Sequence, residues 1–320
     1  MMHTLDGSES RAFFFKGKQL HYNQSRHNNL GERAVEVPIA FDFLATVADS
    51  GSICEIGNVL ANYEQLYDPG QRYQSRQIID KYEPGERITN IDVLDLPPEP
   101  KYNTIISIST VEHVEQEHSS EHVFLNRDLE APLKAIAKIY DLLAPDGRAL
   151  ITVPFGKLLD GRWYIQFSQE YLDLLTMSYG IPAEALTVTF LRRLIAPEQC
   201  WVEASSDQLR HSEYYAPMPY ANAIAVIELH KRSSDVRLSP DHAPNALPYA
   251  DEIDHYTLVL AAYRRMVADG EAVVRQRIAA GQSLEQIVAQ GLPSEWRPWL
   301  APTIAERWLE SIYHSITSAS

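Results

Sequence analysis

The sequence predicts an α/β fold, with a doubly wound, mostly parallel seven-stranded sheet followed by a C-terminal helical extension. From about residue 50 to 155, short apolar runs alternate with helical stretches. Several of these runs are apolar throughout, which is typical of strands that are covered on both faces. Repetition of strand, helix and strand predicts parallel strands joined by helical crossovers.

Five strands are predicted in this region, over residues 52–57, 76–80, 87–92, 102–109 and 147–154. Before the last of them, residues 129–143 carry apolar side chains at helical spacing. That pattern stops at "APDG", a turn signal. The segment therefore predicts a helix that crosses from the fourth strand to the fifth.

The pattern changes after Pro154. Residues 168–180 predict a helix that stops at Gly180. Residues 186–193 and 221–231 are then strand-like, without a full helical crossover between them, which suits an antiparallel pair at the edge of the sheet. Residues 50–231 thus form the predicted main domain, preceded by a lead-in segment and helix over 1–49.

A linker is predicted over residues 232–254, which are rich in Ser, Asp and Pro. Residues 255–320 beyond it are expected to be helical. Capping-box patterns at Ser283 with Gln286 and at Thr303 with Glu306 open two short helices. One apolar stripe, ended by Gly281, precedes them: Tyr256, Val259, Leu260, Tyr263, Val267, Val274 and Ile278. Such a stripe favours core packing over a ligand site.

Composition excludes several classes of protein. The chain has 320 residues, of which 45% are hydrophobic and 22% charged, as expected for a globular protein. Its net charge of -15 disfavours nucleic acid and membrane surfaces as partners. Two cysteines make neither a disulfide framework nor a zinc cluster, so a reducing, cytoplasmic setting is expected. Neither a signal peptide nor a membrane-spanning segment is predicted.

The stretch "CEIGNVLA" over residues 54–61 resembles a nucleotide-binding turn with a single glycine. A dinucleotide turn needs several glycines because its backbone must approach a pyrophosphate. S-adenosylmethionine has no phosphate, so one glycine suffices. Asn58 is expected to tolerate a left-handed conformation. A helix that begins near Val59 or Leu60 would point its positive end at the methionine carboxylate.

Two acids follow the next strands in the order that this cofactor requires. Asp80 stands at the end of the second strand, where it would bind the ribose diol, and Asp92 follows the third, where it would accept from the adenine amino group. "IIDKYE", "IDVLDLP", "YNTIISISTVEHV" and "LLAPDGRALITVPFG" complete the series that "CEIG" begins. In this order they resemble the motifs of class I S-adenosylmethionine-dependent methyltransferases, which have a Rossmann-like fold. The chain departs from that pattern at Val59 and Ala61.

The resemblance implies a role for each residue of these motifs. Glu55, Gly57 and Asn58 would surround the methionine moiety. Asp80 would hold the ribose, and Asp92 with Val93 the adenine. Ser109 and Thr110 would face the sulfonium. Two alternatives stay open: Glu55 caps the following helix, and Asp92 or Asp95 is a solvated loop acid. "GERAVEVPIAF" over 31–41 is similar to the lead-in of a branch found near glycan-assembly genes.

Methyl transfer needs chiefly the alignment of nucleophile, methyl group and sulfur. An oxygen nucleophile also needs a base, and Glu112 and His113 follow the fourth strand. The alternative is that both belong to the scaffold. After the fifth strand, three aromatic residues either line an acceptor pocket or cover the sheet: Trp163, Tyr164 and Phe167.

A metal site is weighed in the loop after the fourth strand and is not expected. His118 and His122 lie there among Glu115, Glu117 and Glu121, a composition that favours a solvated acidic loop. The tail is similar to the helical end of metallo-β-lactamase-fold hydrolases, in which His242 would correspond to a zinc ligand. The chain lacks the rest of that metal site, so no hydrolase activity is expected. The helices are expected to pack on the main domain or to pair with a second copy.

The sequence therefore predicts methyl transfer from S-adenosylmethionine to a small-molecule or glycan-type acceptor. One alternative is a methyltransferase-like module that serves binding or assembly through its helical tail. Another is an NAD-dependent oxidoreductase, which would need a pyrophosphate against the bulky Val59 and Leu60.

Overall fold

The computed structural model describes most of the chain. The described residues are 11–25, 27–47, 51–116, 127–194, 200–215, 220–233, 270, 272–291 and several positions between 306 and 317. Statements below concern these residues. Within them, no helix is both long enough and apolar enough to cross a membrane.

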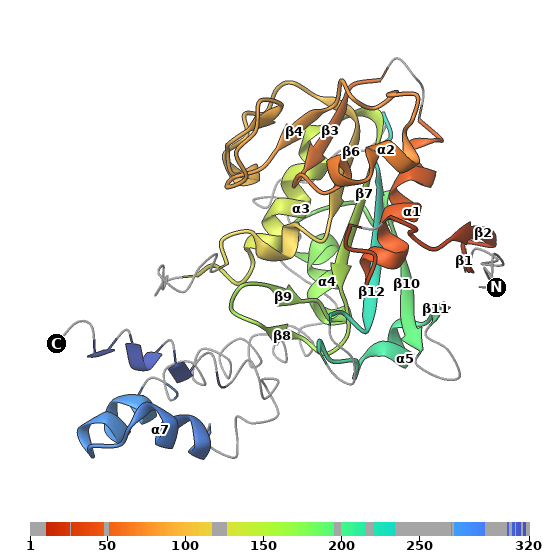
Figure 1. The fold of residues 1–320 in the computed structure, drawn as a ribbon. Helices are drawn as coiled ribbons and strands as arrows, with labels where there is room; N and C mark the ends of the chain where they lie inside the picture. Colours follow the sequence, from red (N-terminus) through yellow and green to blue (C-terminus); the bar gives the residue numbers. More distant parts are fainter. Residues whose placement is uncertain are drawn as a thin grey trace, which may run out of the picture.

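A central sheet of eight strands organises the protein, in the order β11-β10-β12-β7-β6-β3-β4-β5 (Figure 1). Neighbours from β5 to β7 are parallel, and β12, β10 and β11 follow antiparallel. The strands are β3 Ile53–Ile56, β4 Gln77–Ile79, β5 Ile88–Thr89, β6 Tyr102–Ile108, β7 Leu143–Pro154, β10 Leu186–Leu194, β11 Cys200–Ala204 and β12 Ala223–His230. The doubly wound, mostly parallel prediction is confirmed.

The sheet has one strand more than the seven predicted. The extra strand, β11, pairs along β10 at the sheet edge, with Trp201 buried and Val202 exposed. A hairpin of β1 Ala12–Phe15 and β2 Lys18–His21 lies against this edge strand. The amide of Trp201 donates to the Tyr22 hydroxyl at 2.7 Å. Five residues of mixed polarity gave too short a pattern to mark this strand in the sequence.

Helices cover both faces of the sheet. Figure 1 shows α1 (Arg33–Leu44) on one side and α3 (Ala131–Leu142) with α4 (Gln169–Met177) on the other. Alternate residues of β6 feed the two cores: Ile106 packs in the cluster with α1, and Ile105 in the cluster with α3. Burial on both faces explains why these strands read as continuous apolar runs.

The helix predicted after β3 is much shorter than expected. A 3-10 turn, η1 (Leu60–Asn62), leads to α2 (Glu64–Tyr67), which has only four residues. Asp68 ends it, and its carboxylate accepts from the amides of Arg72 and Tyr73 at 2.9 Å each. Local side-chain acceptors thus replace the helical hydrogen bonds.

The remaining elements are short and connect the larger ones. They are η2 Val93–Asp95, η3 Val111–His113, β8 Leu159–Asp160, β9 Ile165–Gln166, η4 Ala183–Ala185 and α5 Ser206–Leu209. In the tail, α7 (Leu284–Gln290) has the predicted capping box of Ser283 and Gln286. Most of the predicted linker, the first part of the apolar stripe, Thr303, His118, His122 and His242 lie outside the described residues.

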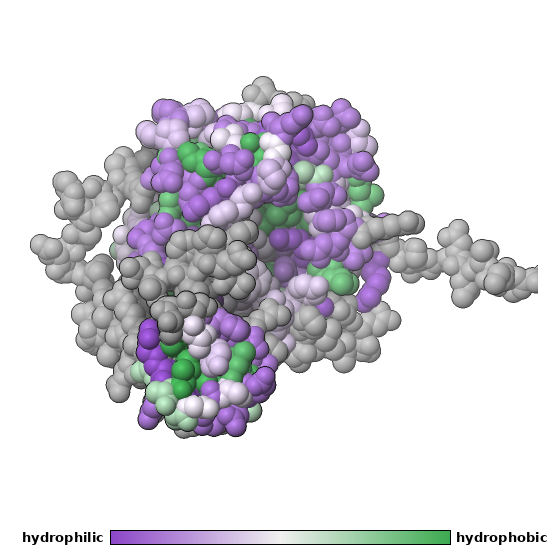
Figure 2. All heavy atoms as spheres, turned by 60° about the vertical axis from the view of Figure 1, so that its left-hand side comes forward, coloured by the Kyte–Doolittle hydropathy of each residue, from purple (hydrophilic) through white to green (hydrophobic). Residues whose placement is uncertain are grey.

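The surface drawn in Figure 2 is largely hydrophilic in its described parts, with apolar residues in small separate patches. This pattern agrees with a net charge of -15.

Candidate active site

A cavity of about 540 Å³ lies at the carboxyl ends of the parallel strands. Strand order reverses beside β3, since β4 and β5 follow on one side and β6 and β7 on the other. Doubly wound sheets bind ligands at such a switch point, and this volume is typical of small-molecule sites. The lining residues are Ile56, Gly57, Ile79, Asp80, Lys81, Tyr82, Glu83, Ile91, Asp92, Val93, Ser109, Thr110, His113, Val114, Glu115, Gln116 and Trp163.

Gly57 forms the end of β3 in the cavity wall. Its φ of +85° favours glycine, and a Cβ atom there would stand 2.1 Å from Oγ1 of Thr110. The glycine is thus required by close packing of the β3 end against the β6 end. Positive φ falls at Gly57 and not at Asn58, which corrects the left-handed conformation expected for the asparagine. Asn58 does not line the cavity; its Nδ2 donates to Glu83 at 2.7 Å.

Glu55 points away from the cavity and is buried. Its Oε1 accepts from the amides of Val59 and Leu60 at 2.9 and 2.6 Å, and its Oε2 pairs with Nε of Arg76 at 2.6 Å. Burial raises the pKa of Glu55, and the guanidinium of Arg76 opposes that rise. These contacts agree with the alternative in which Glu55 caps the segment that follows β3. They also correct the expected helix-end site, because both amides are occupied and α2 is a single turn.

Asp80 is fixed in the cavity wall by backbone donors. Its Oδ1 accepts from the amides of Tyr82 and Glu83 at 2.9 and 2.8 Å, while its Oδ2 has a longer contact of 3.4 Å to the amide of Asn58. A carboxylate oxygen accepts more than one hydrogen bond. Oδ2 can therefore still accept from a hydroxyl group in the cavity.

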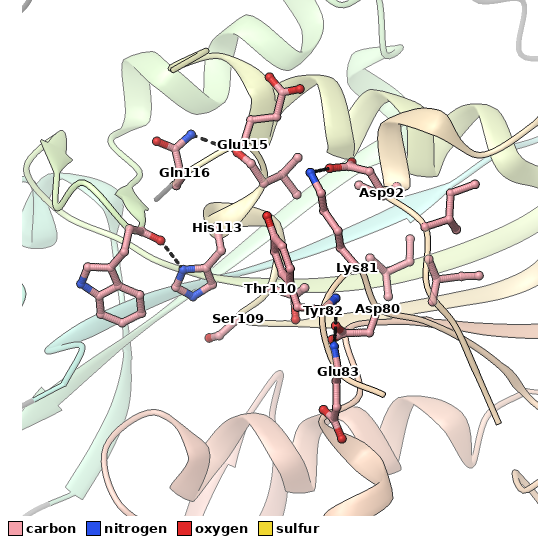
Figure 3. Close-up of a pocket in the computed structure, with 17 residues that line it drawn as sticks. Asp80, Lys81, Tyr82, Glu83, Asp92, Ser109, Thr110, His113, Glu115 and Gln116 are labelled. Atoms are coloured by element: carbon pink, nitrogen blue, oxygen red, sulfur yellow. Dashed lines mark hydrogen bonds and ion pairs between the residues drawn. The ribbon is translucent and has the colours of Figure 1, made fainter. Parts of the chain in front are cut away.

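Asp92 also lines the cavity, but both of its oxygens are engaged. Oδ1 caps η2 by accepting from the amide of Leu94 at 2.9 Å, and Oδ2 pairs with Nζ of Lys81 at 2.9 Å. Figure 3 shows the Lys81 side chain extended along the cavity toward Asp92. This hydrogen bond raises the pKa of Lys81. Each oxygen of Asp92 already accepts one hydrogen bond, so an adenine amino group would share Asp92 with Lys81 or with the amide of Leu94.

Ser109 and Thr110 end β6 beside Gly57. Ser109 has a φ of +39°, a conformation that costs a non-glycine residue about 1–2 kcal/mol. Its hydroxyl donates to Oε1 of Glu36 at 2.6 Å, while the Thr110 hydroxyl donates to the carbonyl of Ile108 at 3.0 Å. The strained turn brings both residues to the cavity, at the place where the methyl donor's sulfur is expected.

His113 lines the cavity, stacked on the indole of Trp163 with ring centroids 4.8 Å apart. Its Nδ1 lies 2.5 Å from the Trp163 carbonyl (Figure 3). Because a carbonyl only accepts, Nδ1 carries a proton. Nε2, which lies 3.7 Å from Oε1 of Glu112, is then the nitrogen that could accept one.

Glu112 does not line the cavity and is 2% exposed. Its Oε2 has no hydrogen-bond partner among the described residues. Burial raises the pKa of Glu112 well above its usual value, and the charges of Glu36 and Glu32 raise it further. Of the candidate bases, only His113 therefore faces the cavity directly.

Several lining residues were not predicted. Three of them directly follow Asp80: Lys81, Tyr82 and Glu83. The Asp80 carboxylate accepts from the amides of Tyr82 and Glu83 and so fixes a turn there. An Asp at the end of a strand was the sequence signal that could have predicted this turn. Of the three aromatic candidates, Trp163 lines the cavity, whereas Tyr164 and Phe167 are buried. Phe167 packs edge-on against Tyr171 and so covers the sheet.

No protein-family model matches the chain, and no curated protein matches it significantly. Solved structures similar to it include an S-adenosylmethionine-dependent methyltransferase of Archaeoglobus fulgidus, with 11% identity and a TM-score of 0.38 over 60% of this chain and 92% of that one. Another is the N-methyltransferase NodS of Bradyrhizobium japonicum with S-adenosylhomocysteine, at 15% identity and a TM-score of 0.33 over 60% and 83%. A third is a 1,6-didemethyltoxoflavin N1-methyltransferase of Burkholderia thailandensis, with 13% identity and a TM-score of 0.33 over 69% of this chain and 99% of that one.

Similarity at this level does not identify an activity. The order of the strands and the cavity at the switch point are features of this chain itself. Together they give it a doubly wound, Rossmann-like fold with a cavity at the switch point of the sheet.

Proposed function

We propose that the protein binds S-adenosylmethionine and transfers its methyl group to a small-molecule or glycan-type acceptor. The observation that carries the proposal is one cavity, at the switch point of the sheet, into which Asp80, Asp92 and Ser109 are brought by three different strands. When bound, the cofactor would supply an electrophilic methyl group on a sulfonium. The chain has to hold the nucleoside and align the nucleophile.

The lining residues fit a nucleoside without phosphate. Oδ2 of Asp80 can accept a hydrogen bond from a ribose hydroxyl. The apolar Ile79, Ile91 and Val93 line the same cavity as Asp92 and could contact the adenine ring. Gly57 leaves the β3 end without a side chain at the centre of this wall.

A dinucleotide fits less well. Its pyrophosphate would need backbone amides after Gly57, but the amides of Val59 and Leu60 already donate to Glu55. These contacts argue against a pyrophosphate at this turn, which NAD would require.

His113 is the proposed base for a hydroxyl acceptor. The Trp163 carbonyl holds the proton on Nδ1, so Nε2 is the ring nitrogen that carries the lone pair in the neutral imidazole. Pairing of two copies through the C-terminal helices stays a prediction, which light scattering on the full chain tests.

Calorimetry with S-adenosylhomocysteine tests the cofactor proposal. Asp80→Asn keeps an acceptor for the amides of Tyr82 and Glu83 but removes the charge, so we expect intact folding and binding weakened more than tenfold. Asp42→Asn is the control, since Asp42 pairs with Lys18 away from the cavity.

Unchanged affinity in Asp80→Asn would remove Asp80 from the site. If the wild-type chain binds no S-adenosylhomocysteine, the binding-module alternative is favoured. A ligand at 100 times its dissociation constant adds about 2.7 kcal/mol to stability, so thermal unfolding gives an independent measurement. A shift with NAD alone would favour the oxidoreductase.

A further inference from the structure

A buried ion pair stands at the base of the turn that carries Trp163. The turn joins β8 to β9, and the pair consists of Arg127 and Asp160, whose side chains are 7% and 3% exposed. Nη1 and Nη2 of Arg127 each donate to one carboxylate oxygen of Asp160, a bidentate arrangement. Neither residue lines the cavity, so any effect of the pair on a ligand is transmitted by its neighbours.

The ion pair holds a strained residue of the turn at both of its peptide groups. Arg162 has a φ of +66°, which is unfavourable for a residue with a side chain. Its amide donates to Oδ1 of Asp160 at 2.6 Å, and its carbonyl accepts from Nη1 of Arg127 at 2.6 Å. A strained conformation persists only where the surrounding contacts hold it. The pair therefore fixes the backbone immediately before Trp163.

Trp163 transmits this constraint to His113. Its carbonyl accepts from Nδ1 of His113 at 2.5 Å (Figure 3), and its indole stacks on the imidazole with an interplanar angle of 13°. Both residues line the cavity. The hydrogen bond at one ring nitrogen of a neutral histidine decides which nitrogen carries the proton. The carbonyl therefore selects the tautomer with the proton on Nδ1 and the lone pair on Nε2.

Arg127 is also tied to the chain segment of His113. Nη1 of Arg127 donates to Oε1 of Gln116 at 2.9 Å, and Gln116 is 2% exposed. The Gln116 amide in turn donates to the His113 carbonyl at 3.0 Å. One guanidinium thus contacts both of the segments that bring the Trp163 carbonyl to Nδ1.

We propose that Arg127 and Asp160 are positioning residues, whose ion pair keeps the Trp163 carbonyl on Nδ1 of His113 and so leaves Nε2 basic toward a hydroxyl acceptor. The proposal rests on the proposed function, in which His113 takes the acceptor's proton. A buried ion pair adds little stability compared with apolar residues of similar volume. Its value here lies in the single geometry that its hydrogen bonds impose on the turn.

The reaction that this geometry serves balances without a further reactant. The acceptor hydroxyl gives its proton to Nε2 of His113, and its oxygen forms a bond to the methyl carbon. The electrons of the C–S bond return to sulfur. The products are a methyl ether, a neutral thioether and an imidazolium, whose Nδ1 proton stays on the Trp163 carbonyl.

Nitrogen NMR of the full chain tests the proposal without an acceptor. The chain is labelled with 15N-histidine and measured at about pH 8.5, roughly two units above the ordinary pKa of histidine. The signal lost in His113→Gln identifies His113, and we expect it to be protonated on Nδ1 in the wild-type chain. Arg127→Gln combined with Asp160→Asn leaves no buried charge behind. This double variant should lower the ratio of the Nδ1–H to the Nε2–H tautomer by roughly three- to tenfold, the worth of one hydrogen bond.

Two further variants make the result specific. Glu55→Gln combined with Arg76→Gln is the matched control, because it removes a second buried ion pair at another place in the fold and should leave the His113 ratio unchanged. Arg127→Lys is the milder change, for use if the double variant does not fold. An ammonium has three donors for the four oxygens that the guanidinium contacts, so the ratio should fall by about twofold or more.

A wild-type His113 protonated on Nε2 overturns the proposal without any variant. An unchanged ratio in a folded Arg127 variant overturns it as well, and so does an equal fall in the matched control, because lost stability alone would then explain the change. Calorimetry with S-adenosylhomocysteine separates this proposal from the proposed function. No binding together with the expected fall in ratio refutes the cofactor and leaves the link from the ion pair to His113 intact. Binding together with an unchanged ratio refutes the positioning role.

Discussion

Replacing Glu55 with glutamine separates a structural role from a cofactor-binding role for the first motif. Glu55 and Arg76 have side chains that are each 1% exposed, and they form an ion pair at 2.6 Å. Glutamine keeps one oxygen for the amides of Val59 and Leu60. Its amide nitrogen, however, would face Nε of Arg76, so the guanidinium loses one of its two carboxylate partners and keeps Glu64.

The size of the effect follows from burial. Removing one partner of a buried ion pair costs about 3–5 kcal/mol. Arg76 keeps two other contacts, to the Glu64 carboxylate and to the Tyr73 carbonyl. We therefore expect Glu55→Gln to lower the free energy of unfolding by about 3 kcal/mol. Affinity of the folded chain for S-adenosylhomocysteine should stay within about twofold, because Glu55 does not line the cavity.

Urea unfolding at pH 7 measures this loss as a midpoint lowered by roughly 1 M at constant slope. Glu64→Gln is the matched control: Glu64 is 13% exposed and also binds Arg76, so it should cost only about 1 kcal/mol. Adding Arg76→Gln to Glu55→Gln should recover part of the loss, since the buried guanidinium that faced Glu55 is then removed. Unchanged stability together with a tenfold loss of affinity would refute the reasoning and make Glu55 a cofactor ligand.

Three further predictions concern single side chains. Gly57→Ala should lower the free energy of unfolding by about 3 kcal/mol or more, because its Cβ would meet Thr110 at 2.1 Å and its φ is positive. Urea unfolding measures this loss, and a variant as stable as the wild-type chain would contradict the prediction. Lys81→Met should tighten S-adenosylhomocysteine binding about two- to fivefold in calorimetry by freeing Asp92, and weaker binding would instead make Lys81 a ligand. Burial raises the pKa of Glu32 from 4.5 to about 7. Protonated Glu32 therefore contributes its full share to the free energy of unfolding below pH 4.5, and this contribution is lost as the pH rises through 7. Glu32→Gln should remove that decline and have a free energy of unfolding about 3 kcal/mol higher than the wild-type chain at pH 8. Parallel pH profiles of stability for the two chains would disprove this.

The sequence predicted most of the sheet because the relevant signals are local. Continuous apolar runs mark β3, β4, β6 and β7, since each strand is buried on both faces. The site could be placed for a related reason. In a parallel sheet the carboxyl ends of the strands meet at one edge, so the sequence predicts that Asp80, Asp92 and Ser109 lie close together.

The sequence-based predictions were incomplete where a side chain contacts a partner that local sequence patterns do not reveal. Glu55 pairs with Arg76 and accepts from the amides of Val59 and Leu60, so it does not line the cavity. The ion pair between Lys81 and Asp92 was not predicted, because nothing in the local sequence marks it. β11 was missed because five residues at a sheet edge carry little periodicity.

The sequence by itself thus determined the doubly wound sheet, the chain order of its parallel strands and the edge at which a ligand would bind. Only the tertiary structure decided which acids line the cavity and which are buried behind it. Ser109 meets Glu36 across 73 positions, and Glu32 meets Ala221 across 189. Hydrophobic periodicity records which face of an element is buried, whereas a polar contact depends on which distant group the folded chain brings within about 3 Å.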